Sequence, residues 1–444
     1  MKDRAGDPSD PIRSVWMSIV DPHGRLKGKQ YGVQYFLDEV AGHNVEMCGY
    51  LVDSDGQNRP VPDLPNGDWS SGYPDIEVFP CLPSLALMPG QPGAAHLFAI
   101  PMNSSGGPLA ISPHSILRRQ LNRLNDLGLL AQIGLETEFV LYQGTREDMH
   151  RTGYSAPSPV ASRNLDYSAD APPAVHDYLD SLAIALADSG HPVEALKLEG
   201  APGQVEVTFP YRSDVEDVCH QHLRMQTAAM RLAERQGMTA SFMAAPETGV
   251  GNGLHIHLSL WDKDTPCFAG QPGDEPEAIL GAALGGLLEA LPDLTPLYAP
   301  AASSYRRYTD ESFAPTALNW GHDNRTCAVR LVGKGASRHL EVRVPGADAN
   351  PLLAVAAVIG GVVEGIERNL HAPDAVTGNG YRSGAPRVAG SLHKALKRFR
   401  DSALAINILG PDVVTHYDAL GQHAVRIHDR EVSDVDRRLW YSRA

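Results

Sequence analysis

Charged and imidazole side chains recur in pairs, two residues apart, inside apolar stretches of this chain. The pairs are Glu136 and Glu138 in QIGLETEFVLY, His255 and His257 in GNGLHIHLSLW, and Glu341 and Arg343 in SRHLEVRVP. These stretches are rich in β-branched and aromatic residues, which predicts strands. Residues i and i+2 of a strand point to the same face. Each pair is therefore expected to project together from one face of a sheet.

A fourth segment, KLEGAPGQVEVTFP, adds Glu199 and Glu206 on either side of a Pro-Gly turn. Five carboxylates and an imidazole on neighbouring strands repel one another unless cations compensate their charge. Glutamate oxygens suit hard ions such as Mg²⁺ or Mn²⁺ better than Zn²⁺. One such pair alone is typical of a half-exposed strand. Four such segments in apolar surroundings, where free carboxylates are costly, indicate a metal-centred site.

The composition excludes several classes of protein. The chain has 444 residues, enough for two or three domains, with 43% hydrophobic and 20% charged residues. Its net charge of −15 disfavours nucleic acid as a partner. No apolar run reaches the ~20 residues of a membrane span, so no membrane segment is expected. The five scattered cysteines and the polar first residues predict reduced thiols and a cytoplasmic protein.

The pattern of strands and helices changes near residue 107. The first part contains short strand-like runs, such as SVWMSIVDP at 14–22. SPHSILRRQLNRLNDLGL then predicts a helix capped by Ser112 with Pro113 at its first position. We expect an N-terminal domain at 1–107 and a second domain at 108–444. Further helices are expected at 173–189, at 213–236, and in ANPLLAVAAVIGGVVEGIERNL, which is apolar on all sides and so should be buried.

Seven segments, in order, give the chain a resemblance to the glutamine synthetases of the bacterial dodecameric type over about residues 14–444. They are GLETEF, EGAPGQVE, GNGLHIH, SSYRR, NRTCAVR, HLEVRVP and DANP. The resemblance implies an α+β fold, with a small β-grasp-like N-terminal domain and a catalytic domain built on a curved antiparallel sheet. It also implies a homo-oligomer of two stacked hexameric rings, with active sites shared between neighbouring subunits.

The resemblance also assigns roles to individual residues. It implies ATP as co-substrate and two or three Mg²⁺ or Mn²⁺ ions. The first metal, beside the amino-acid substrate, would be held by Glu138, Glu199 and Glu206. The second, beside the ATP phosphates, would be held by Glu136, His255 and Glu341. Glutamate would contact Gly251, Arg307 and Arg343, and ATP would contact Glu194, His257, Ser259, Arg325 and Arg330. The implied reaction phosphorylates the γ-carboxylate of glutamate, after which an amine displaces phosphate, with Arg307 and Arg325 as catalytic residues.

Two departures from the family concern the amine. Glutamine synthetases carry a glutamate before Ala-Pro in a flap that binds ammonium, whereas YRRYTDESFAP places Phe313 there. A Phe-Asp-Gly-Ser motif supplies their second ammonium-binding carboxylate, but this chain has only Cys48, Gly49 and Tyr50 in the corresponding stretch. An aromatic ring in place of an anion favours an apolar or larger amine over ammonium. This resembles the γ-glutamyl-amide branch, whose enzymes use polyamines, ethanolamine, alkylamines or anilines.

Several points stay open in the sequence. A cationic polyamine needs carboxylates, for which Asp310 and Glu311 are the nearby candidates. His339 stands where the family has an arginine near ATP, with Arg338 beside it. Three alternative functions remain: an ammonia-using glutamine synthetase with a repacked Phe313 loop, a catalytically silent relative, and a guanidino-kinase-like phosphotransferase. Retention of all six metal-ligand residues disfavours the silent relative, and the EGAPGQVE turn disfavours the phosphotransferase.

Overall fold

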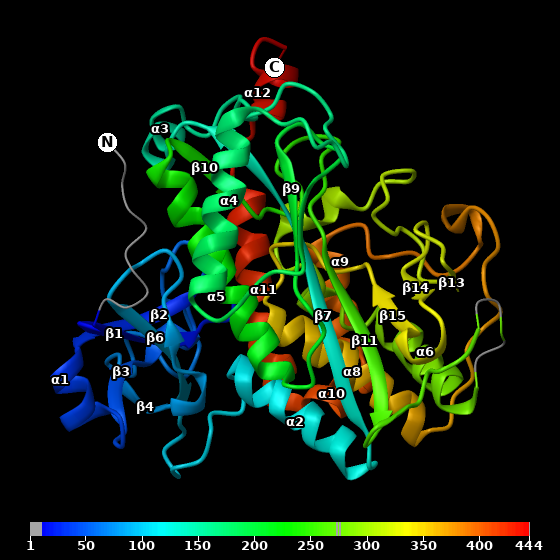
Figure 1. Cartoon of the computed structure of the whole chain (residues 1–444), viewed down its shortest axis with the longest axis horizontal. Helices are drawn as coiled ribbons and strands as arrows, with labels where there is room; N and C mark the ends of the chain where they lie inside the picture. Colours follow the sequence, from blue (N-terminus) through cyan, green and yellow to red (C-terminus); the bar gives the residue numbers. More distant parts are fainter. Residues whose placement is uncertain (1–10, 272–273, 275–276, 444) are drawn as a thin grey trace.

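Two β-sheets and a set of mostly packed helices make up the molecule (Figure 1). The computed structural model describes residues 11–271, 274 and 277–443. The smaller sheet comes from the first hundred or so residues, and the larger sheet from residues 130–342. The predicted α+β class is thereby confirmed. None of the described helices is at once long and apolar enough to cross a lipid bilayer.

The smaller sheet has six strands, with β1 and β6 paired in parallel at its centre. Its order is β2-β1-β6-β4-β3, and β5 adds to β6. The strands are β1 (Ser14–Val20), β2 (Leu26–Gly32), β3 (Val45–Cys48), β4 (Asp75–Pro80), β5 (Ala86–Leu87) and β6 (Ala94–Pro101). Val15, Met17 and Ile19 of β1 are buried at alternate positions, which forms the core of this sheet.

The larger sheet has nine strands in the order β13-β14-β15-β11-β7-β9-β8, with β10 paired to β7 and β12 paired to β11. All its pairings are antiparallel except β13 with β14. The strands are β7 (Leu130–Gln143), β8 (Ala195–Leu198), β9 (Gln204–Thr208), β10 (Met238–Ser241), β11 (Leu254–Asp262), β12 (Thr265–Pro266), β13 (Trp320–His322), β14 (Val329–Val332) and β15 (His339–Val342). The long strand β7 is the spine, since it pairs with β9, β10 and β11.

Helices pack against this sheet and close the core. They are α1 (Val33–Tyr35), α2 (Pro113–Asp126), α3 (Arg146–Arg151), α4 (Pro173–Asp188), α5 (Val215–Arg235), α6 (Ala278–Ala290), α7 (Thr295–Tyr298), α8 (Pro351–Glu367), α9 (Leu392–Asp401), α10 (Ala403–Leu409), α11 (Pro411–Arg430) and α12 (Asp434–Trp440). Ser112 caps α2 as predicted, with its side chain accepting from the Ser115 N–H. The helices expected at 173–189 and 213–236 appear as α4 and α5.

The apolar helix α8 is buried, as its sequence predicts, because it crosses α6 at very short distance. A Cβ atom on Gly286 of α6 would lie 2.3 Å from the carbonyl oxygen of Gly361 and 2.3 Å from the nitrogen of Gly365 on α8. Such backbone contact is possible only without side chains. The two helices therefore form a rigid support within the main hydrophobic core.

A buried arginine joins the two sheets. Arg224 of α5 donates from Nε to His96 Nδ1 on β6 over 3.3 Å, and its Nη1 lies 3.1 Å from His191 Nε2. Next to it, the Nε2 atoms of His114 and His220 are 2.8 Å apart. Burial lowers the pKa of these imidazoles, for His114 to about 3, because it disfavours the charged ring. The junction is thus built to hold neutral histidines around one cation.

The Gly286→Ala variant tests the helix contact. The added methyl group collides with the backbone of α8, so we expect a loss of about 1–3 kcal/mol or more in the free energy of unfolding. Thermal or urea denaturation measures it. Gly42→Ala is the control, because a Cβ at Gly42 meets nothing within 4 Å. Equal stability of the two variants would contradict the close packing of α6 on α8.

The junction predicts a pH dependence of stability. The pKa of His114 falls from 6.5 to about 3 on folding, so its stabilising contribution is present above pH 6.5 and is lost as the pH falls towards 3. Between these two pH values, each such histidine increases the slope of the free energy of unfolding against pH by about 1.4 kcal/mol per pH unit. Urea unfolding at several pH values should show that the free energy of unfolding rises less steeply with pH in His114→Gln than in the wild type. The exposed His43, changed to Gln, should leave the slope as in the wild type.

Candidate active site

The first acidic cluster consists of Glu138, Glu199 and Glu206, whose carboxylate oxygens lie within 4.8 Å of one another. Glu138 of β7 stands directly opposite Glu206 of β9 in the strand register, and Glu199 follows the end of β8. The turn between Glu199 and Glu206 requires Gly203, because its φ is +72° and a Cβ there would lie 2.7 Å from the Leu141 carbonyl oxygen. The sequence segment EGAPGQVE therefore folds to present its two carboxylates together.

One lysine partly balances this cluster. Lys197 of β8 forms an ion pair with Glu199, and its Nζ lies 3.7 Å from Glu206 and 4.4 Å above the Tyr167 ring. Burial and the nearby charge of Glu136 raise the pKa of Glu206 well above its ordinary value. The raised pKa of Glu206 shows that one ammonium group does not supply enough positive charge to keep all three crowded carboxyl groups ionised. The residues present therefore fit a divalent cation bound by oxygen ligands.

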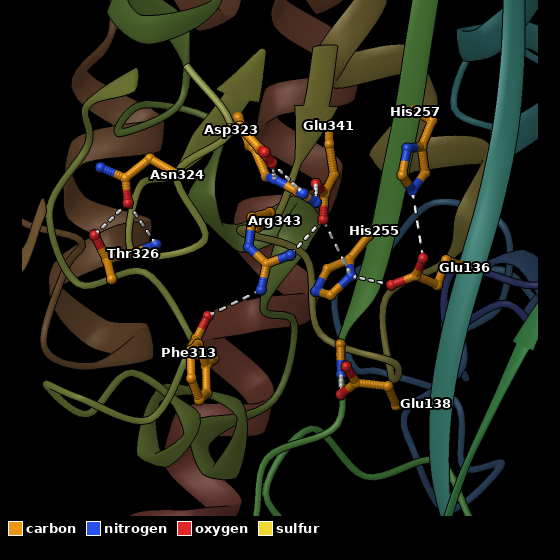
Figure 2. Close-up of polar contacts among 12 residues, drawn as sticks. Glu136, Glu138, His255, His257, Phe313, Asp323, Asn324, Thr326, Glu341 and Arg343 are labelled. Carbon is orange, nitrogen blue, oxygen red and sulfur yellow. Dashed lines mark hydrogen bonds and ion pairs between the residues drawn. The ribbon is translucent and has the colours of Figure 1, made fainter. Parts of the chain in front are cut away.

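The second cluster consists of Glu136, His257 and Glu341, whose ligand atoms also lie within 4.8 Å of one another. His255 adjoins it: its Nδ1 lies 2.7 Å from a Glu136 oxygen and 3.7 Å from a Glu341 oxygen (Figure 2). Register explains the grouping, since Glu136 is opposite His255 on β7 and β11, and His257 is opposite Glu341 on β11 and β15. Directly opposed side chains on one face lie close together.

Both carboxylates of the second cluster are held in the ionised form. Burial alone would raise the pKa of Glu136, but the adjoining imidazoles of His255 and His257 lower it below its ordinary value. Burial likewise opposes ionisation of Glu341, and the nearby Arg343 and His255 outweigh it, lowering the pKa of Glu341 to about 2. A metal ligand must be ionised, so this environment suits cation binding.

A chain of hydrogen bonds sets the tautomer of His257. His339 Nδ1 lies 2.8 Å from the Ser337 carbonyl oxygen and must donate to it. His339 Nε2 then accepts, with the Tyr211 hydroxyl at 2.8 Å and His257 Nδ1 at 3.1 Å. The lone pair of His257 is left on Nε2, 3.6 Å from a Glu136 oxygen. His257, predicted to contact the nucleotide, thus shares the second cluster with His255, predicted as a metal ligand.

Two arginines meet at Glu341. Arg330 of β14 donates to one Glu341 oxygen over 2.7 Å and also pairs with Asp323. Arg343 pairs with the other Glu341 oxygen, and its Nη2 donates to the Phe313 carbonyl over 3.4 Å. Figure 2 shows Arg343 between Glu341 and the main chain of Phe313. The loop that carries Phe313 therefore borders the second cluster.

Arg307 is buried, and its guanidinium donates to the main-chain oxygens of Val344 and Arg343 over 3.0 and 3.2 Å. Within the described part of the chain, Arg307 forms no ion pair with a carboxylate. Its guanidinium is therefore available to bind an anionic substrate. Arg325 is exposed and likewise makes no ion pair with any described residue. The structure thus places Arg307 at the site, whereas Arg325 is exposed at the surface of the protein.

The loop before β11 approaches these groups closely. A Cβ on Gly253 would lie 2.7 Å from Arg307 Nη2 and 2.8 Å from His255 Nε2, and the Gly253 N–H donates to Glu138 over 2.6 Å. Gly251, predicted to contact glutamate, has less severe crowding, with Arg307 Cγ at 3.1 Å. Its carbonyl oxygen accepts from Gln204 Nε2 over 2.8 Å. The second glycine of GNGLHIH is therefore the more tightly constrained of the two.

Sequence reasoning missed several groups that complete the site: Lys197, Gln204, Tyr211, Asn252 and Gly253. Lys197 could have been found, because it stands two residues before Glu199 on the same strand face. Gln204 holds the Asn252 side chain over 2.9 Å, and no sequence signal pairs these two residues. The role of Tyr211 depends on a long-range contact with His339 that no local pattern reveals.

Other predicted residues do not belong to either cluster. Cys48 ends strand β3 of the smaller sheet and Tyr50 lies in the 3-10 turn that follows it, and Figure 1 shows β3 on the opposite side of the molecule from β13–β15. Glu194 is exposed just before β8, and Ser259 accepts from the Trp261 indole on β11 over 2.9 Å. Phe313 is 63% exposed with a φ of +62°, a strained conformation for an aromatic residue.

Two acidic clusters on one sheet, bordered by arginines, have the groups that could hold divalent cations beside an anionic substrate. Comparisons with known proteins agree with this class of site. Residues 110–440 match the family described as glutamine synthetase, catalytic domain. The chain belongs to the glutamine synthetase family, as its sequence motifs predict.

Curated relatives cover almost the whole chain. It is 37% identical over 439 residues to gamma-glutamylethanolamide synthetase GlnA4 of Streptomyces coelicolor, covering 99% of this chain and 94% of the relative. It is 31% identical to the glutamate–isopropylamine ligase of a Pseudomonas species, covering 91% and 90%. It is also 31% identical to gamma-glutamylputrescine synthetase PuuA of Escherichia coli, covering 80% and 73%.

Solved structures share the fold. A chain described as the GmaS/ADP complex superposes with a TM-score of 0.84 at 24% identity, covering 99% of this chain and all of the other. A novel glutamine synthase homolog superposes with a TM-score of 0.79 at 25% identity, covering 97% and 98%. The glutamine synthetase fold is thereby shown for this chain.

Removal of one carboxylate from each cluster tests them as metal sites. We expect Glu138→Ala and Glu341→Ala to abolish turnover and to reduce the rise in melting temperature caused by Mn²⁺, because each variant loses a ligand of one cluster. Glu289→Ala is the control, since Glu289 pairs only with Arg368 at the surface. Wild-type Mn²⁺ stabilisation and activity in either cluster variant would contradict the assignment.

Proposed function

We propose that this chain is an ATP-dependent ligase that joins the γ-carboxylate of glutamate to an organic amine through a γ-glutamyl phosphate. The observation that carries the proposal is the pairing of two intact acidic clusters with an aromatic residue, Phe313, at the loop bordering them. The relatives named as ethanolamide, isopropylamine and putrescine ligases support the same class of reaction.

Each cluster receives a role under this proposal. Two or three Mg²⁺ or Mn²⁺ ions, held by Glu138, Glu199 and Glu206 and by Glu136, His255, His257 and Glu341, would neutralise phosphate charge and act as Lewis acids. The buried Arg307 binds a carboxylate of glutamate, aided by Arg343, because a planar guanidinium matches a carboxylate. Gly251 and Gly253 allow close approach of the main chain to the substrate.

The nucleotide would lie on the β14 side of the sheet. Arg330 and the exposed Arg325 contact the phosphates of ATP and stabilise the transferring phosphoryl group. Glu194 and Ser259 complete the nucleotide contacts. These assignments follow from the family resemblance, and the position of Arg330 beside Glu341 supports them.

The amine would enter beside Phe313. An ammonium site needs anionic groups that hold a small hydrated cation and accept its proton. Phe313 offers an apolar ring instead, and its loop lies against Arg343 at the edge of the second cluster. Burying on the order of 60 Å² of an alkyl group there gains about 1.5 kcal/mol, roughly tenfold in binding.

We also propose the assembly and location of the protein. Strand β3, which Cys48 ends, lies on the opposite side of the molecule from β13–β15 (Figure 1), so Cys48 and Tyr50 would serve a neighbouring subunit. This supports a homo-oligomer, in two stacked hexameric rings, with domains 1–107 and 108–444 meeting across subunits. A cytoplasmic location follows from its use of ATP and its five free cysteines.

The preference for organic amines tests the proposed function. With ATP, Mg²⁺ and glutamate, phosphate release should be far faster with ethanolamine or propylamine than with ammonium at equal concentration. Phe313→Glu should shift the preference towards ammonium, because it restores an anion at the amine. Tyr154→Glu is a matched control, since Tyr154 is 67% exposed with a φ of +58° on another surface. Equal rates of phosphate release with ammonium and with organic amines in the wild type would contradict the proposal.

A further inference from the structure

The loop that carries Phe313 is clamped by ion pairs from a second loop. We call residues 309–315 the flap and residues 379–388 the clamp loop. Arg387 of the clamp loop donates to Asp310 over 2.7 Å, and Arg382 lies 3.4 Å from Glu311. Asp310 also accepts from the Thr316 hydroxyl. Both flap carboxylates are therefore engaged by guanidinium groups.

Main-chain hydrogen bonds fix the clamp loop itself. The Leu318 N–H donates to the Pro386 carbonyl over 2.7 Å, and the Val388 N–H donates to the Thr316 carbonyl over 3.0 Å. Arg387 is further held by its own bond to the Tyr381 carbonyl over 3.0 Å. The arginines thus project from a backbone that is tied to the base of the flap.

The charge of the flap is consequently balanced. Hydrogen bonds from Thr316 and Arg387 lower the pKa of Asp310, so the carboxyl is ionised and matched by the guanidinium. Glu311 is paired with Arg382 over 3.4 Å. Neither carboxylate is left over to receive a second cation from a substrate. The sequence alone suggested Asp310 and Glu311 as partners for a cationic polyamine. In the structure both carboxylates are already paired with arginines.

Beside Phe313, no unpaired carboxylate remains among the described residues: Arg343, which donates to the Phe313 carbonyl, is paired with Glu341. The Tyr381 side chain is only 6% exposed, and its hydroxyl has no hydrogen-bond partner among the described residues. Tyr381 lies close to the main chain of Phe313, and the charges of Arg343, Asp310 and Arg307 act on its hydroxyl. An aromatic ring and a phenol hydroxyl can receive an alkyl or hydroxyalkyl group. They give no compensation for an ammonium group that has lost its water.

We propose that the amine substrate is a small monoamine with a neutral tail, and that Arg382 and Arg387 are positioning residues that enforce this choice by neutralising the flap carboxylates. The inference rests on the proposed glutamate–amine ligase function and narrows it to one substrate class. Diamines and longer polyamines are disfavoured because their second cation meets a charge-balanced flap.

Matched amines test the proposal on the full-length enzyme. Pentylamine and putrescine are similar in length and differ in the second amino group. The wild type should use pentylamine with a kcat/KM about fivefold or more above that of putrescine, since the second ammonium group loses solvation without gaining a carboxylate. Ethanolamine and propylamine should both be substrates. A wild type that prefers putrescine to pentylamine would overturn the inference and leave the ligase function standing.

Arginine variants test the cause. Arg387→Ala frees Asp310 and Arg382→Ala frees Glu311, so each should raise the ratio of putrescine to pentylamine use about threefold to fivefold, the scale of one exposed ion pair. Arg368→Ala, which removes a surface ion pair with Glu289, should leave the ratio unchanged. An unchanged ratio in both clamp variants would show that the flap carboxylates do not face the amine, and would overturn the inference.

The two levels of the account can fail separately. Coupling of organic amines with the wrong charge preference contradicts only the neutral-tail inference. Failure of every organic amine, together with glutamine formation from ammonium, contradicts the proposed function and with it the inference. The KM values for ATP and glutamate in the clamp variants should stay near those of the wild type, because Arg382 and Arg387 act at the flap.

Discussion

Mutual repulsion of carboxylates on one sheet face is the constraint on which the rest of the structure depends. Glu138 and Glu206 oppose each other across β7 and β9, and Glu136 lies on the same strand two residues away. Such groups stay together only with compensating charge and a rigid frame. Lys197, Arg330 and Arg343 supply part of that charge from the protein. The negative charge that remains is suited to binding divalent cations, which a phosphoryl-transfer site requires.

The frame is rigid for identifiable reasons. The strand register of the nine-stranded sheet sets every opposed pair, so a slip of one residue would send the ligands to the other face. Behind the sheet, α6 and α8 touch through glycines at Gly286, Gly361 and Gly365. Towards the smaller sheet, Arg224 binds histidines from separate segments in a buried junction. At the surface, the flap with Phe313 has strained backbone angles and is paired with Arg382 and Arg387.

Much of this arrangement could be predicted from the sequence, because its signals are local. The two-residue spacing predicted which side chains share a face, and the structure brings together all six residues proposed as metal ligands; their binding of metal stays a prediction. The capped helix at Ser112 and the buried apolar helix were also predictable. The tautomer chain from His339 to His257 was not, since it depends on contacts between residues far apart in sequence. Nor could the sequence show that Arg382 and Arg387 neutralise the flap, because ion pairs between loops follow from tertiary structure alone.

The central claim is that the two clusters are built to hold divalent cations side by side. Crystals of the protein grown with Mn²⁺ and a nonhydrolysable ATP analogue test it through the anomalous scattering of manganese. The account predicts one peak among Glu138, Glu199 and Glu206 and at least one more beside Glu136 and Glu341, with an imidazole of His255 or His257 as a ligand. Lys197 should then turn away from Glu199. Maps without peaks at either cluster, with Lys197 still paired to Glu199, would contradict it.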